Sequence, residues 1–420
     1  MIAKIFPSNC KGKVTVPSSK SYGHRAIICA CLAEGISRIQ NLQLSDDIIA
    51  TIEAIRALGA VIEEKENELV VQGISEFVSK NNTIDCKESG STLRFLLPLF
   101  SLTKQEITFV GQNRLLKRPY HIYEGIFHKQ GLKFEQENAA LTIHGALQAG
   151  DYCVDGNISS QFITGLLLTL PLLDGDSYLE VKEPFESKSY VEMTRETLSI
   201  FGIEIVEVEM NRYYIPGKQK YGANDYTVEG DYSQFAFFAV LAALKQPLDI
   251  IGVTHHSLQG DQAILRILEE FGAKIETIPE GYCISPNNSN AITVDLQNCP
   301  DLGPIVCVLL SQIAQKSTLL NIKRLQYKES NRMKAMQEEL EKVGVLMELE
   351  ENRAFISSRK NEEKSVKFNG HQDHRIVMAL AILIIVLGIE GEIHGAEAIQ
   401  KSYPSFFVDL KKLGIEIECR

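Results

Sequence analysis

The chain has 420 residues, of which 45% are apolar and 23% are charged. These are ordinary values for a globular protein, and a chain of this length is expected to form at least two domains, each with its own core. The formal net charge of −11 argues against broad binding of nucleic acid. An anionic ligand would therefore need a local basic cluster inside an otherwise acidic molecule.

Cysteine usage and hydropathy indicate a protein of the cytoplasm that binds no membrane. The nine cysteines are odd in number and form no CxxC pair, and Cys29, Cys31 and Cys307 lie in apolar runs typical of reduced core residues. The N-terminus lacks the apolar region and cleavage site of a signal peptide. The longest apolar run, residues 376–389, is too short to span a bilayer and is predicted to be a core helix.

The first element with unusual polar residues is a helix start near Lys20. Residues 13–16 alternate like a short strand that ends at Pro17, and the apolar run 26–33 predicts a buried helix. Lys20 and Arg25 therefore flank a helix start, where cations oppose the helix dipole unless an anion lies between them. Taken alone, this stretch also fits an ordinary capped helix with two solvated cations.

The chain consists of six copies of one repeat. A helix that ends in glycine, followed by two to four residues of strand, recurs at intervals of 70 to 72 residues. A glycine just after a helix supplies the left-handed C′ residue, and the β-branched residues that follow begin a strand. Small or polar residues precede a second, apolar helix in each copy. The six glycines are Gly59, Gly131, Gly202, Gly272, Gly344 and Gly414.

Each repeat is predicted to have the element order βαβαββ, so the predicted fold class is α/β. Six equal repeats predict two domains of three repeats each, with the crossing point at residues 228–230. Pro17 marks where the N-terminal strand crosses over to complete the sixth repeat, which stops just after Ile417. The predicted domains are residues 18–228, and residues 1–17 together with 229–420.

Most of the unusual polar residues lie at predicted helix starts, in phase with the repeat. Hydroxyls and amides at such starts suit phosphate, whereas cations gathered in a cleft repel one another unless anions separate them. Because repeats are expected to be arranged alike, we predict that these starts gather in a cleft between the domains. They span residues 88–94, 114–119, 157–162, 187–190, 373–375 and 401–404.

The densest polar cluster spans residues 323–332. On a helix, Lys328 and Arg332 are four residues apart and Glu329 and Arg332 are three apart, so all three are expected to share a surface. Taken alone, this pattern also fits a solvated helix face. Together with the other helix starts, it favours a site for a polyanion.

Several classes of site are excluded by absent motifs. The chain contains no GxxxxGK[ST] and no GxGxxG that opens a helix after a strand, which argues against nucleotide kinases and dehydrogenases, and it has no Gly-x-Ser-x-Gly elbow. His371 and His374 have no third ligand in a metal-binding pattern, so no metal is expected. What remains is chemistry without metal or cofactor on small phosphorylated acids, with cations for phosphate and carboxylate and side chains that move protons.

Nine motifs in a fixed order carry a family resemblance. They are Ser-Lys-Ser-x-x-x-Arg at 19–25, Ser-Gly-Ser-x-x-Arg at 89–94, Arg-Pro at 118–119, Ser-Ser-Gln-Phe at 159–162, Ser-Lys-x-Tyr at 187–190, Pro-Asp at 300–301, Lys-Glu-x-x-Arg at 328–332, Asp-His-Arg at 373–375 and Lys-x-x-Pro at 401–404. By these motifs the chain resembles the 5-enolpyruvylshikimate-3-phosphate synthases from Lys20 to Pro404, in register throughout.

The resemblance implies a fold and an activity. The fold is a pair of three-repeat inside-out α/β domains, the barrel-like arrangement of this family, that close over the substrates. The activity is transfer of the enolpyruvyl group from phosphoenolpyruvate to the 5-hydroxyl of shikimate 3-phosphate, with release of phosphate. The resemblance also implies a monomer whose partners are these two small molecules.

The resemblance implies roles for individual residues. Asp301 would take the proton from the attacking oxygen, while Glu329 and Lys20 would serve the proton at the methylene carbon. Phosphoenolpyruvate would be held by Lys20, Gly90, Arg118, Gln161, Arg332, Arg375 and Lys401. Shikimate 3-phosphate would be held by Ser21, Arg25, Ser159, Ser160, Gln161, Ser187, Tyr190, Asp301 and Lys328.

Five positions depart from the pattern of the family, and two alternatives stay open. The departures are Ser19 where Gly is usual, Gly23 where Ser is common, Glu88 and Arg324 where Asn is usual, and Asn331 where Asp is usual. The UDP-N-acetylglucosamine enolpyruvyl transferases share the fold, but they usually carry a reactive Cys in a loop that has none here, residues 111–117. The second alternative is a non-catalytic anion-binding relative, which only Glu88 and Arg324 support.

Overall fold

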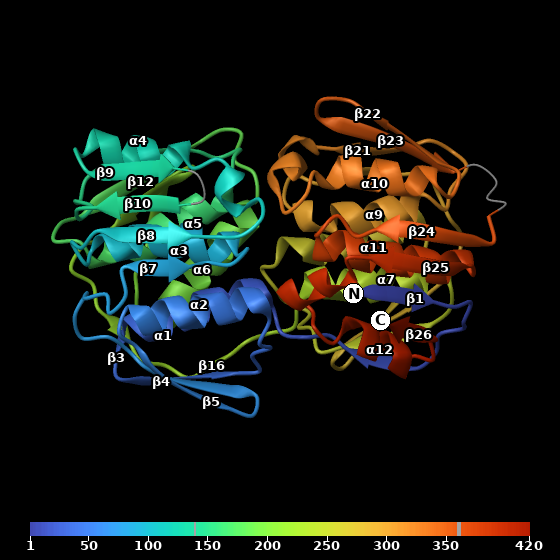
Figure 1. Ribbon diagram of the computed structural model, residues 1–420, viewed down its shortest axis with the longest axis horizontal. Coiled ribbons are helices and arrows are strands. Elements are labelled where there is room, and N and C mark those ends of the chain that lie inside the picture. The colour runs from blue at the N-terminus through green and yellow to red at the C-terminus, as the bar shows by residue number, and fades with distance from the viewer. Residues whose placement is uncertain (138–139, 359–362) are drawn as a thin grey trace. The chain divides into compact units, whose positions relative to one another are not determined.

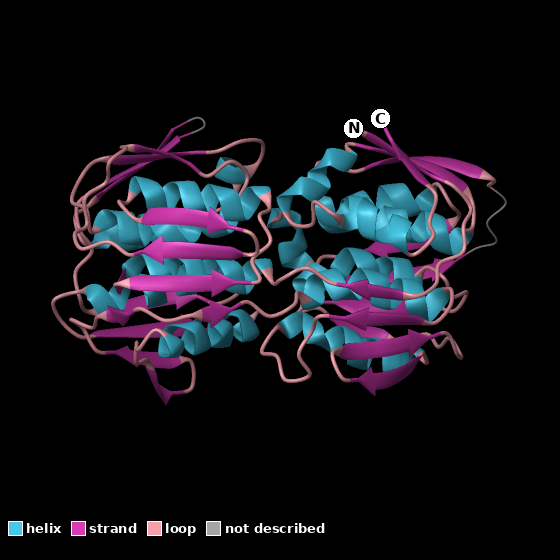
Figure 2. Cartoon of the chain, turned by 90° about the horizontal axis from the view of Figure 1, so that it is seen from below, coloured by secondary structure: helices cyan, strands magenta, loops and turns pink. Residues whose placement is uncertain are grey.

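The computed structural model describes residues 1–137, 140–358 and 363–420. The chain divides into two compact units, which we call the N-terminal domain (residues 18–228) and the C-terminal domain (residues 1–17 and 229–420). In each domain, helices lie at the centre and strands lie around them (Figures 1 and 2).

The N-terminal domain has three central helices that are buried over nearly their whole length and three outer helices buried on one face. A helix that is apolar all round, as α5 is beyond its first turn, has to be buried, whereas an amphipathic helix covers the core with one face. The central helices are α1 (Lys20–Leu32), α3 (Gly90–Ser101) and α5 (Ser160–Thr169), and the outer ones are α2 (Asp46–Ala57), α4 (His121–Lys129) and α6 (Lys188–Ile200), with short 3-10 turns η1 (Leu115–Lys117) and η2 (Leu170–Leu172).

Three four-stranded sheets surround these helices and share one strand order. In each sheet a parallel pair of strands is extended by two further strands that pair antiparallel with each other. The sheets are β7 (Thr83–Asp85), β8 (Ile107–Val110), β10 (Ala140–His144) and β9 (Lys133–Glu137); β11 (Asp151–Asp155), β12 (Ser177–Lys182), β14 (Arg212–Ile215) and β13 (Val206–Glu209); and β16 (Tyr226–Thr227), β4 (Ile36–Gln40), β6 (Glu68–Gln72) and β5 (Val61–Lys65). A small sheet pairs β3 (Ala33–Glu34) with β15 (Tyr221–Gly222).

The C-terminal domain repeats this plan. Its central helices are α7 (Tyr232–Leu244), α9 (Gly303–Leu310) and α11 (His374–Leu387), its outer helices are α8 (Ile264–Phe271), α10 (Arg332–Glu341) and α12 (Phe406–Lys412), and its 3-10 turns are η3 (Gly260–Ala263), η4 (Pro300–Leu302), η5 (Lys323–Tyr327) and η6 (Ala396–Lys401). Its sheets are β20 (Thr293–Asp295), β21 (Ser317–Leu320), β23 (Arg353–Ser358) and β22 (Val345–Leu349); β24 (Ser365–Asn369), β25 (Glu390–His394), β1 (Ile2–Ile5) and β26 (Ile417–Cys419); and β2 (Lys13–Thr15), β17 (Leu248–Ile251), β19 (Gly281–Ser285) and β18 (Lys274–Ile278).

Two strands from the beginning of the chain belong to the C-terminal domain. β1 lies between β25 and β26, with Ile5 opposite Gly391 and Ile417, so it supplies the fourth strand of the sixth repeat. β2 runs parallel to β17, with Val14 opposite Ile250. The two ends of the chain therefore meet in one sheet, where the Ile2 amide donates to the Arg420 carbonyl at 2.8 Å (Figure 1).

The predicted fold class is confirmed, and the glycines explain how each repeat turns from helix to strand. All six repeat glycines have positive φ, between 69° and 114°. A residue with a side chain is rarely stable there, whereas glycine adopts this conformation without steric cost. The glycine thus ends the outer helix and directs the chain into the antiparallel hairpin of the same repeat.

The apolar run at residues 376–389 is a core helix, as predicted. It forms most of α11, which ends at Gly388 with φ of 65°. In the part of the chain that the structure describes, no helix is long and apolar enough to cross a membrane. All nine cysteines are free thiols, and burial raises the pKa of Cys31 to about 12, which makes it unreactive at neutral pH.

A substitution at Gly165 can test the close packing of α3 against α5. A Cβ at this position would overlap the Tyr123 hydroxyl and the Arg94 carbonyl oxygen, which are hydrogen-bonded to each other at 2.6 Å. We expect Gly165→Ala to lower the free energy of unfolding by about 1–3 kcal/mol, because buried backbone would have to move. Urea denaturation measures this change.

Gly125 provides the matched control for that substitution. It lies in α4 and is exposed, and a Cβ added there would approach no atom of another element within 4 Å. Alanine favours helix over glycine by about 1 kcal/mol, so Gly125→Ala is expected to stabilise the protein. Equal effects of the two substitutions would contradict the packing described for Gly165.

Candidate active site

Lys20 is the first residue of α1, where an ammonium group opposes the helix dipole. Its Nζ donates to Oδ2 of Asp47, in the first turn of α2, at 2.7 Å. Ser19 caps α1 by accepting a hydrogen bond from the Tyr22 amide at 3.4 Å. The carboxylate of Asp47 therefore offsets a charge that the helix start alone would disfavour.

Arg25 lies just over one turn into α1 and is buried, with 2% of its surface exposed. Its guanidinium donates to Thr194 Oγ1 at 2.8 Å and to the carbonyl oxygens of Ser21 at 2.7 Å and Tyr190 at 2.9 Å. Burial lowers the pKa of Arg25 to about 10. Among the described residues it forms no ion pair, so this buried cation joins α1 to α6 through neutral acceptors.

Gly90, Arg118 and Gln161 meet at the start of α3. A Cβ on Gly90 would lie 2.6 Å from Nη1 of Arg118 and 3.3 Å from Oε1 of Gln161, so only glycine lets the guanidinium approach this closely. Gln161 accepts a hydrogen bond from Arg94 at 2.8 Å and donates to Ser91 at 3.0 Å. The amide of Gln161 is thereby fixed between α3 and α5.

Three predicted hydroxyl residues lie at the starts of α5 and α6. Ser159 caps α5 by accepting from the Gln161 amide at 3.3 Å, and Ser160 is the first residue of the helix. Ser187 precedes α6 with φ of 58°, and its carbonyl accepts from the Tyr190 amide at 3.1 Å. Tyr190 in turn accepts from Arg25, so these helix starts share hydrogen bonds within the N-terminal domain.

A buried chain of hydrogen bonds joins α1 to the cap of α3. His24 Nδ1 lies 2.7 Å from Thr51 Oγ1, which lies 2.7 Å from Thr92 Oγ1. Thr92 donates to Ser89, the cap of α3, at 2.7 Å. Burial, with the charges of nearby cations, holds the pKa of His24 well below its ordinary value, so the ring is neutral.

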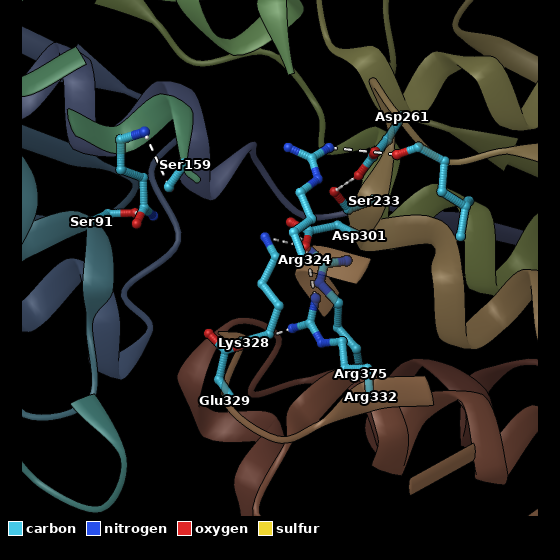
Figure 3. A network of polar contacts seen from close by, with 12 residues as sticks. Ser91, Ser159, Ser233, Asp261, Asp301, Arg324, Lys328, Glu329, Arg332 and Arg375 are labelled. Carbon is cyan, nitrogen blue, oxygen red and sulfur yellow. Dashed lines mark hydrogen bonds and ion pairs between the residues drawn. The ribbon is translucent and has the colours of Figure 1, made fainter. Parts of the chain in front are cut away.

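Arg332 is the centre of an ion cluster in the C-terminal domain. It is 1% exposed and contacts three carboxylates: Asp301 at 2.7 Å and Glu329 at 2.7 Å (Figure 3), and Asp373 at 2.9 Å. Burial alone would lower the pKa of Arg332, but the charges of these carboxylates outweigh it and raise the pKa. The guanidinium is therefore always charged.

Asp301 contacts three cations. Besides Arg332, it accepts from Nη2 of Arg375 at 2.9 Å and lies 3.3 Å from Nζ of Lys328 (Figure 3). Burial would raise its pKa, but the charges of these cations hold the pKa of Asp301 well below its ordinary value. Burial in turn lowers the pKa of Lys328, against the opposing charge of Asp301.

Asp373 and Lys401 complete the cluster from the last repeat. Asp373 is fully buried, caps α11 by accepting from the Arg375 amide at 3.0 Å, and accepts from the Ser330 hydroxyl at 3.0 Å. Lys401 ends η6, and its Nζ donates to the carbonyl of Gln372 at 2.6 Å. Asp373 thus orients Arg332 while its own backbone position is fixed by the helix start.

The predicted residues divide into two groups, one in each domain. The N-terminal domain holds Lys20, Ser21, Arg25, Gly90, Arg118, Ser159, Ser160, Gln161, Ser187 and Tyr190, and the C-terminal domain holds Asp301, Lys328, Glu329, Arg332, Arg375 and Lys401. No group of three or more His, Cys, Asp or Glu residues in the described ranges is arranged to hold a metal ion.

The helical spacing predicted for residues 328–332 is wrong. Lys328 has extended backbone, with φ of −80° and ψ of −161°, and α10 begins only at Arg332. Asn331 is the cap of α10, where its side chain accepts from the Lys334 amide at 3.3 Å, and a cap residue has non-helical backbone. The three side chains still converge, because Lys328 reaches Asp301 from the turn before the helix.

The structure shows the surroundings of three of the residues that depart from the family pattern. Arg324 is buried and donates to the carbonyl oxygens of Leu296 at 3.5 Å and of Gln297, so it holds the turn before Asp301. Asn331 replaces one good helix cap by another. Gly23 lets Leu42 approach, since a Cβ there would lie 2.8 Å from Leu42 Cδ1.

The sequence did not assign a binding or catalytic role to several residues that the structure places beside the predicted site residues. Asp47 lies in a Ser-Asp-Asp start of an amphipathic helix, and Asp373 lies in one of the nine motifs, so both had a weak local signal. Arg94 also lies in a motif. Asp261 of η3 had no signal, because only tertiary packing brings it to the cluster.

Known proteins resemble this chain over its whole length. The family model of EPSP synthase (3-phosphoshikimate 1-carboxyvinyltransferase) matches residues 6–410. A 3-phosphoshikimate 1-carboxyvinyltransferase of Clostridium kluyveri is 41% identical over 416 residues, which are 99% of this chain and 97% of that protein. The enzyme of the same name from Clostridioides difficile is 41% identical and covers 99% of this chain and 98% of its own length.

The chain belongs to the EPSP synthase family. The resemblance inferred from the nine motifs is thereby confirmed. The fold agrees with solved structures: an EPSP synthase of Acinetobacter baumannii matches with a TM-score of 0.80 at 24% identity, over the full length of both chains. The enolpyruvyl transferase NikO of Streptomyces tendae matches with a TM-score of 0.77 at 14% identity, over 99% of this chain and 98% of its own.

In this EPSP synthase family member, a second buried carboxyl lies close to Asp301. Asp261 is 1% exposed and lies in η3, its Oδ2 accepts from the Ser233 hydroxyl (Figure 3), and its Oδ1 has no hydrogen-bond partner among the described residues. Burial and the negative charge of Asp301 raise the pKa of Asp261 to about 7. Asp261 is therefore an uncharged acid at pH below 7.

Asp261→Asn tests this protonation state. An aspartic acid in the unfolded chain ionises near pH 3.9, so the folded state binds the proton more tightly and loses stability as pH rises from about 4 to 7. The variant lacks this group, so its stability relative to the wild type is expected to rise over that interval and to stay level above pH 7. Urea denaturation of the variant and the wild type at pH 5 and pH 8 measures the difference in their free energies of unfolding. An equal difference at both pH values would contradict the assigned protonation state of Asp261.

Proposed function

We propose that this protein transfers the enolpyruvyl group of phosphoenolpyruvate to the 5-hydroxyl of shikimate 3-phosphate and releases phosphate. The observation that carries this proposal is the full-length family match, together with the presence of every cation and carboxylate of the family motifs in the two groups described above. The reaction belongs to the shikimate pathway of aromatic amino-acid biosynthesis.

Phosphoenolpyruvate carries at most three negative charges, and we assign it to cations of both domains. In the C-terminal domain these are Arg332, Arg375 and Lys401, and in the N-terminal domain they are Lys20 and Arg118, beside Gly90 and Gln161. Guanidinium groups bind phosphate and carboxylate through two parallel hydrogen bonds, which gives both affinity and orientation. The proposal requires both domains to engage the same pair of substrates.

Shikimate 3-phosphate is assigned chiefly to the helix starts of the N-terminal domain. The starts of α1, α5 and α6 offer backbone amides and hydroxyls for the phosphate at Ser21, Ser159, Ser160 and Ser187, with Gln161 and Tyr190 beside them. Arg25 supports this assignment because it is a buried cation without an ion pair in the described chain. Lys328 and Asp301 of the C-terminal domain complete the set.

The chemistry assigns proton transfers to three residues. A proton added to the methylene carbon leaves a cationic centre, which the 5-hydroxyl oxygen attacks while its proton passes to Asp301. The tetrahedral adduct then breaks its bond to phosphate and loses a proton from the methyl group, which restores the double bond. We assign the proton at this carbon to Glu329 and Lys20, and the leaving phosphate to the arginines.

Lys20→Ala and Glu329→Ala test these assignments. Each is expected to lower kcat by at least about 100-fold, the usual worth of a positioned acid or base. Asn331→Asp, which preserves the cap of α10, serves as the control and is expected to change little. Phosphate release from phosphoenolpyruvate and shikimate 3-phosphate measures all three, and full activity of the Lys20 variant would contradict the assignment.

The same phosphate-release assay tests which substrate accepts the enolpyruvyl group and whether the protein is catalytic at all. Release of phosphate with UDP-N-acetylglucosamine but not with shikimate 3-phosphate would overturn the proposal in favour of the sugar-nucleotide enzymes. Binding of both substrates without any release would indicate a non-catalytic relative. A monomer in the cytoplasm stays the prediction from the sequence, and light scattering checks its oligomeric state.

A further inference from the structure

The backbone immediately before Asp373 is strained. His371 and Gln372 have φ of 50° and 54°, so two consecutive residues with side chains occupy the left-handed region. This conformation is uncommon outside glycine, and it persists only where the surrounding structure holds it. Such strain is typical of functional sites, which prompts the question of what holds this loop and what the loop itself holds.

The carboxylate of Glu339 holds the loop. Glu339 is 2% exposed on α10, and it lies 2.9 Å from Nε2 of His371 and accepts from the Asn369 amide at 2.9 Å. Lys342 donates to it at 2.7 Å. Burial opposes ionisation, but these hydrogen bonds outweigh it and lower the pKa of Glu339, so the group is a carboxylate that can only accept.

The loop in turn fixes two parts of the proposed phosphoenolpyruvate site. The carbonyl of Gln372 accepts from Lys401 Nζ at 2.6 Å, and Asp373 directly after it accepts from Arg332 Nε at 2.9 Å. A change of the backbone angles at Gln372 would turn this carbonyl away from Lys401. The strained conformation therefore sets where Lys401 and Arg332 lie.

Helix α10 contacts this loop at two points. Arg332 and Glu339 are both on α10 and are seven residues apart, about two helical turns, so they lie on the same face. Arg332 binds the loop at Asp373, and Glu339 binds it at Asn369 and His371. The helix that carries one substrate-binding arginine thus also determines the position of a lysine from another repeat.

We propose that Glu339, acting through His371 and Asn369, is a positioning residue for phosphoenolpyruvate: it holds the 369–372 loop in the conformation that places Lys401 and Arg332. Glu339 touches no reacting atom. This inference rests on the proposed function, because it concerns the same substrate. It predicts that loss of the Glu339 carboxylate weakens binding of phosphoenolpyruvate and leaves binding of shikimate 3-phosphate unchanged.

The test compares Glu339→Gln with Glu338→Gln. Glu339→Gln keeps the shape of the side chain but removes the charge, and it is expected to raise KM for phosphoenolpyruvate roughly tenfold with kcat nearly unchanged. Glu338 is an exposed neighbour on the same helix, so Glu338→Gln is expected to leave both constants at their wild-type values. Phosphate release at varied concentrations of each substrate gives the constants.

A second variant keeps the test independent of the fate of Glu339→Gln. Asparagine tolerates positive φ, so His371→Asn preserves the backbone but loses the contact of the ring with Glu339. It is expected to raise KM for phosphoenolpyruvate in the same direction by a smaller factor. Thermal unfolding and separate calorimetric titrations with phosphoenolpyruvate and with shikimate 3-phosphate are measured on all three variants and on the wild type.

The outcomes separate the two proposals. Unchanged affinity for phosphoenolpyruvate in both the Glu339 and His371 variants would overturn the positioning role, as would an equal loss of affinity for both substrates. A wild type that binds phosphoenolpyruvate but releases no phosphate would overturn the proposed function alone, because calorimetry on the same variants still decides the role of Glu339.

Discussion

The C-terminal domain depends on the contacts of one buried guanidinium with three carboxylates. Arg332 pairs with Asp301, Glu329 and Asp373, which come from three different segments of the chain. A buried charge is costly unless it is paired, and removal of one partner leaves the others uncompensated. The contacts of Arg332 therefore fix α10, α11 and the turn at η4 relative to one another within this domain.

The repeat explains why residues far apart in sequence lie at equivalent positions of the two domains. In five of the six repeats the chain enters its central helix through a polar cap, and the first turn of a helix leaves backbone amides without a partner inside the helix. Lys20, Gly90 and Ser160 are first residues of central helices, and Lys401 ends a 3-10 turn before an outer helix. A polar residue at such a position lies at the end of a helix, where it does not disturb the core of its domain.

The fold could be predicted from the sequence because its determinants are local. Gly59 and Gly414 are C′ residues wherever the rest of the chain lies, and Ser89, Ser159 and Asp373 cap helices through amides only two or three residues away. Alternating apolar patterns then predict strands between these points. The periodicity of the glycines gave the number of repeats.

The partners of the charged residues could not be predicted, because pairing over a long sequence separation depends on packing. Nothing near Lys20 in sequence indicates Asp47, and nothing near His371 indicates Glu339. The helical register assumed for Lys328 was wrong for a local reason, since Asn331 caps the helix at the point where the pattern alone suggested its interior. The convergence of the cluster was nevertheless correct, because a turn also brings residues three or four apart together.

The position of Asp301 raises a problem that the substrates themselves resolve. Three cations hold its pKa well below the ordinary value, which makes it a poor base while no anion is bound. If the same cations bind the anionic substrates as proposed, phosphoenolpyruvate would offset positive charge beside Asp301 and raise the affinity of Asp301 for a proton. Asp261, uncharged below pH 7 and buried nearby, adds negative charge only above that pH. On this argument the base gains strength when the anion arrives, so proton removal from the 5-hydroxyl is coupled to the presence of the group that the hydroxyl oxygen attacks.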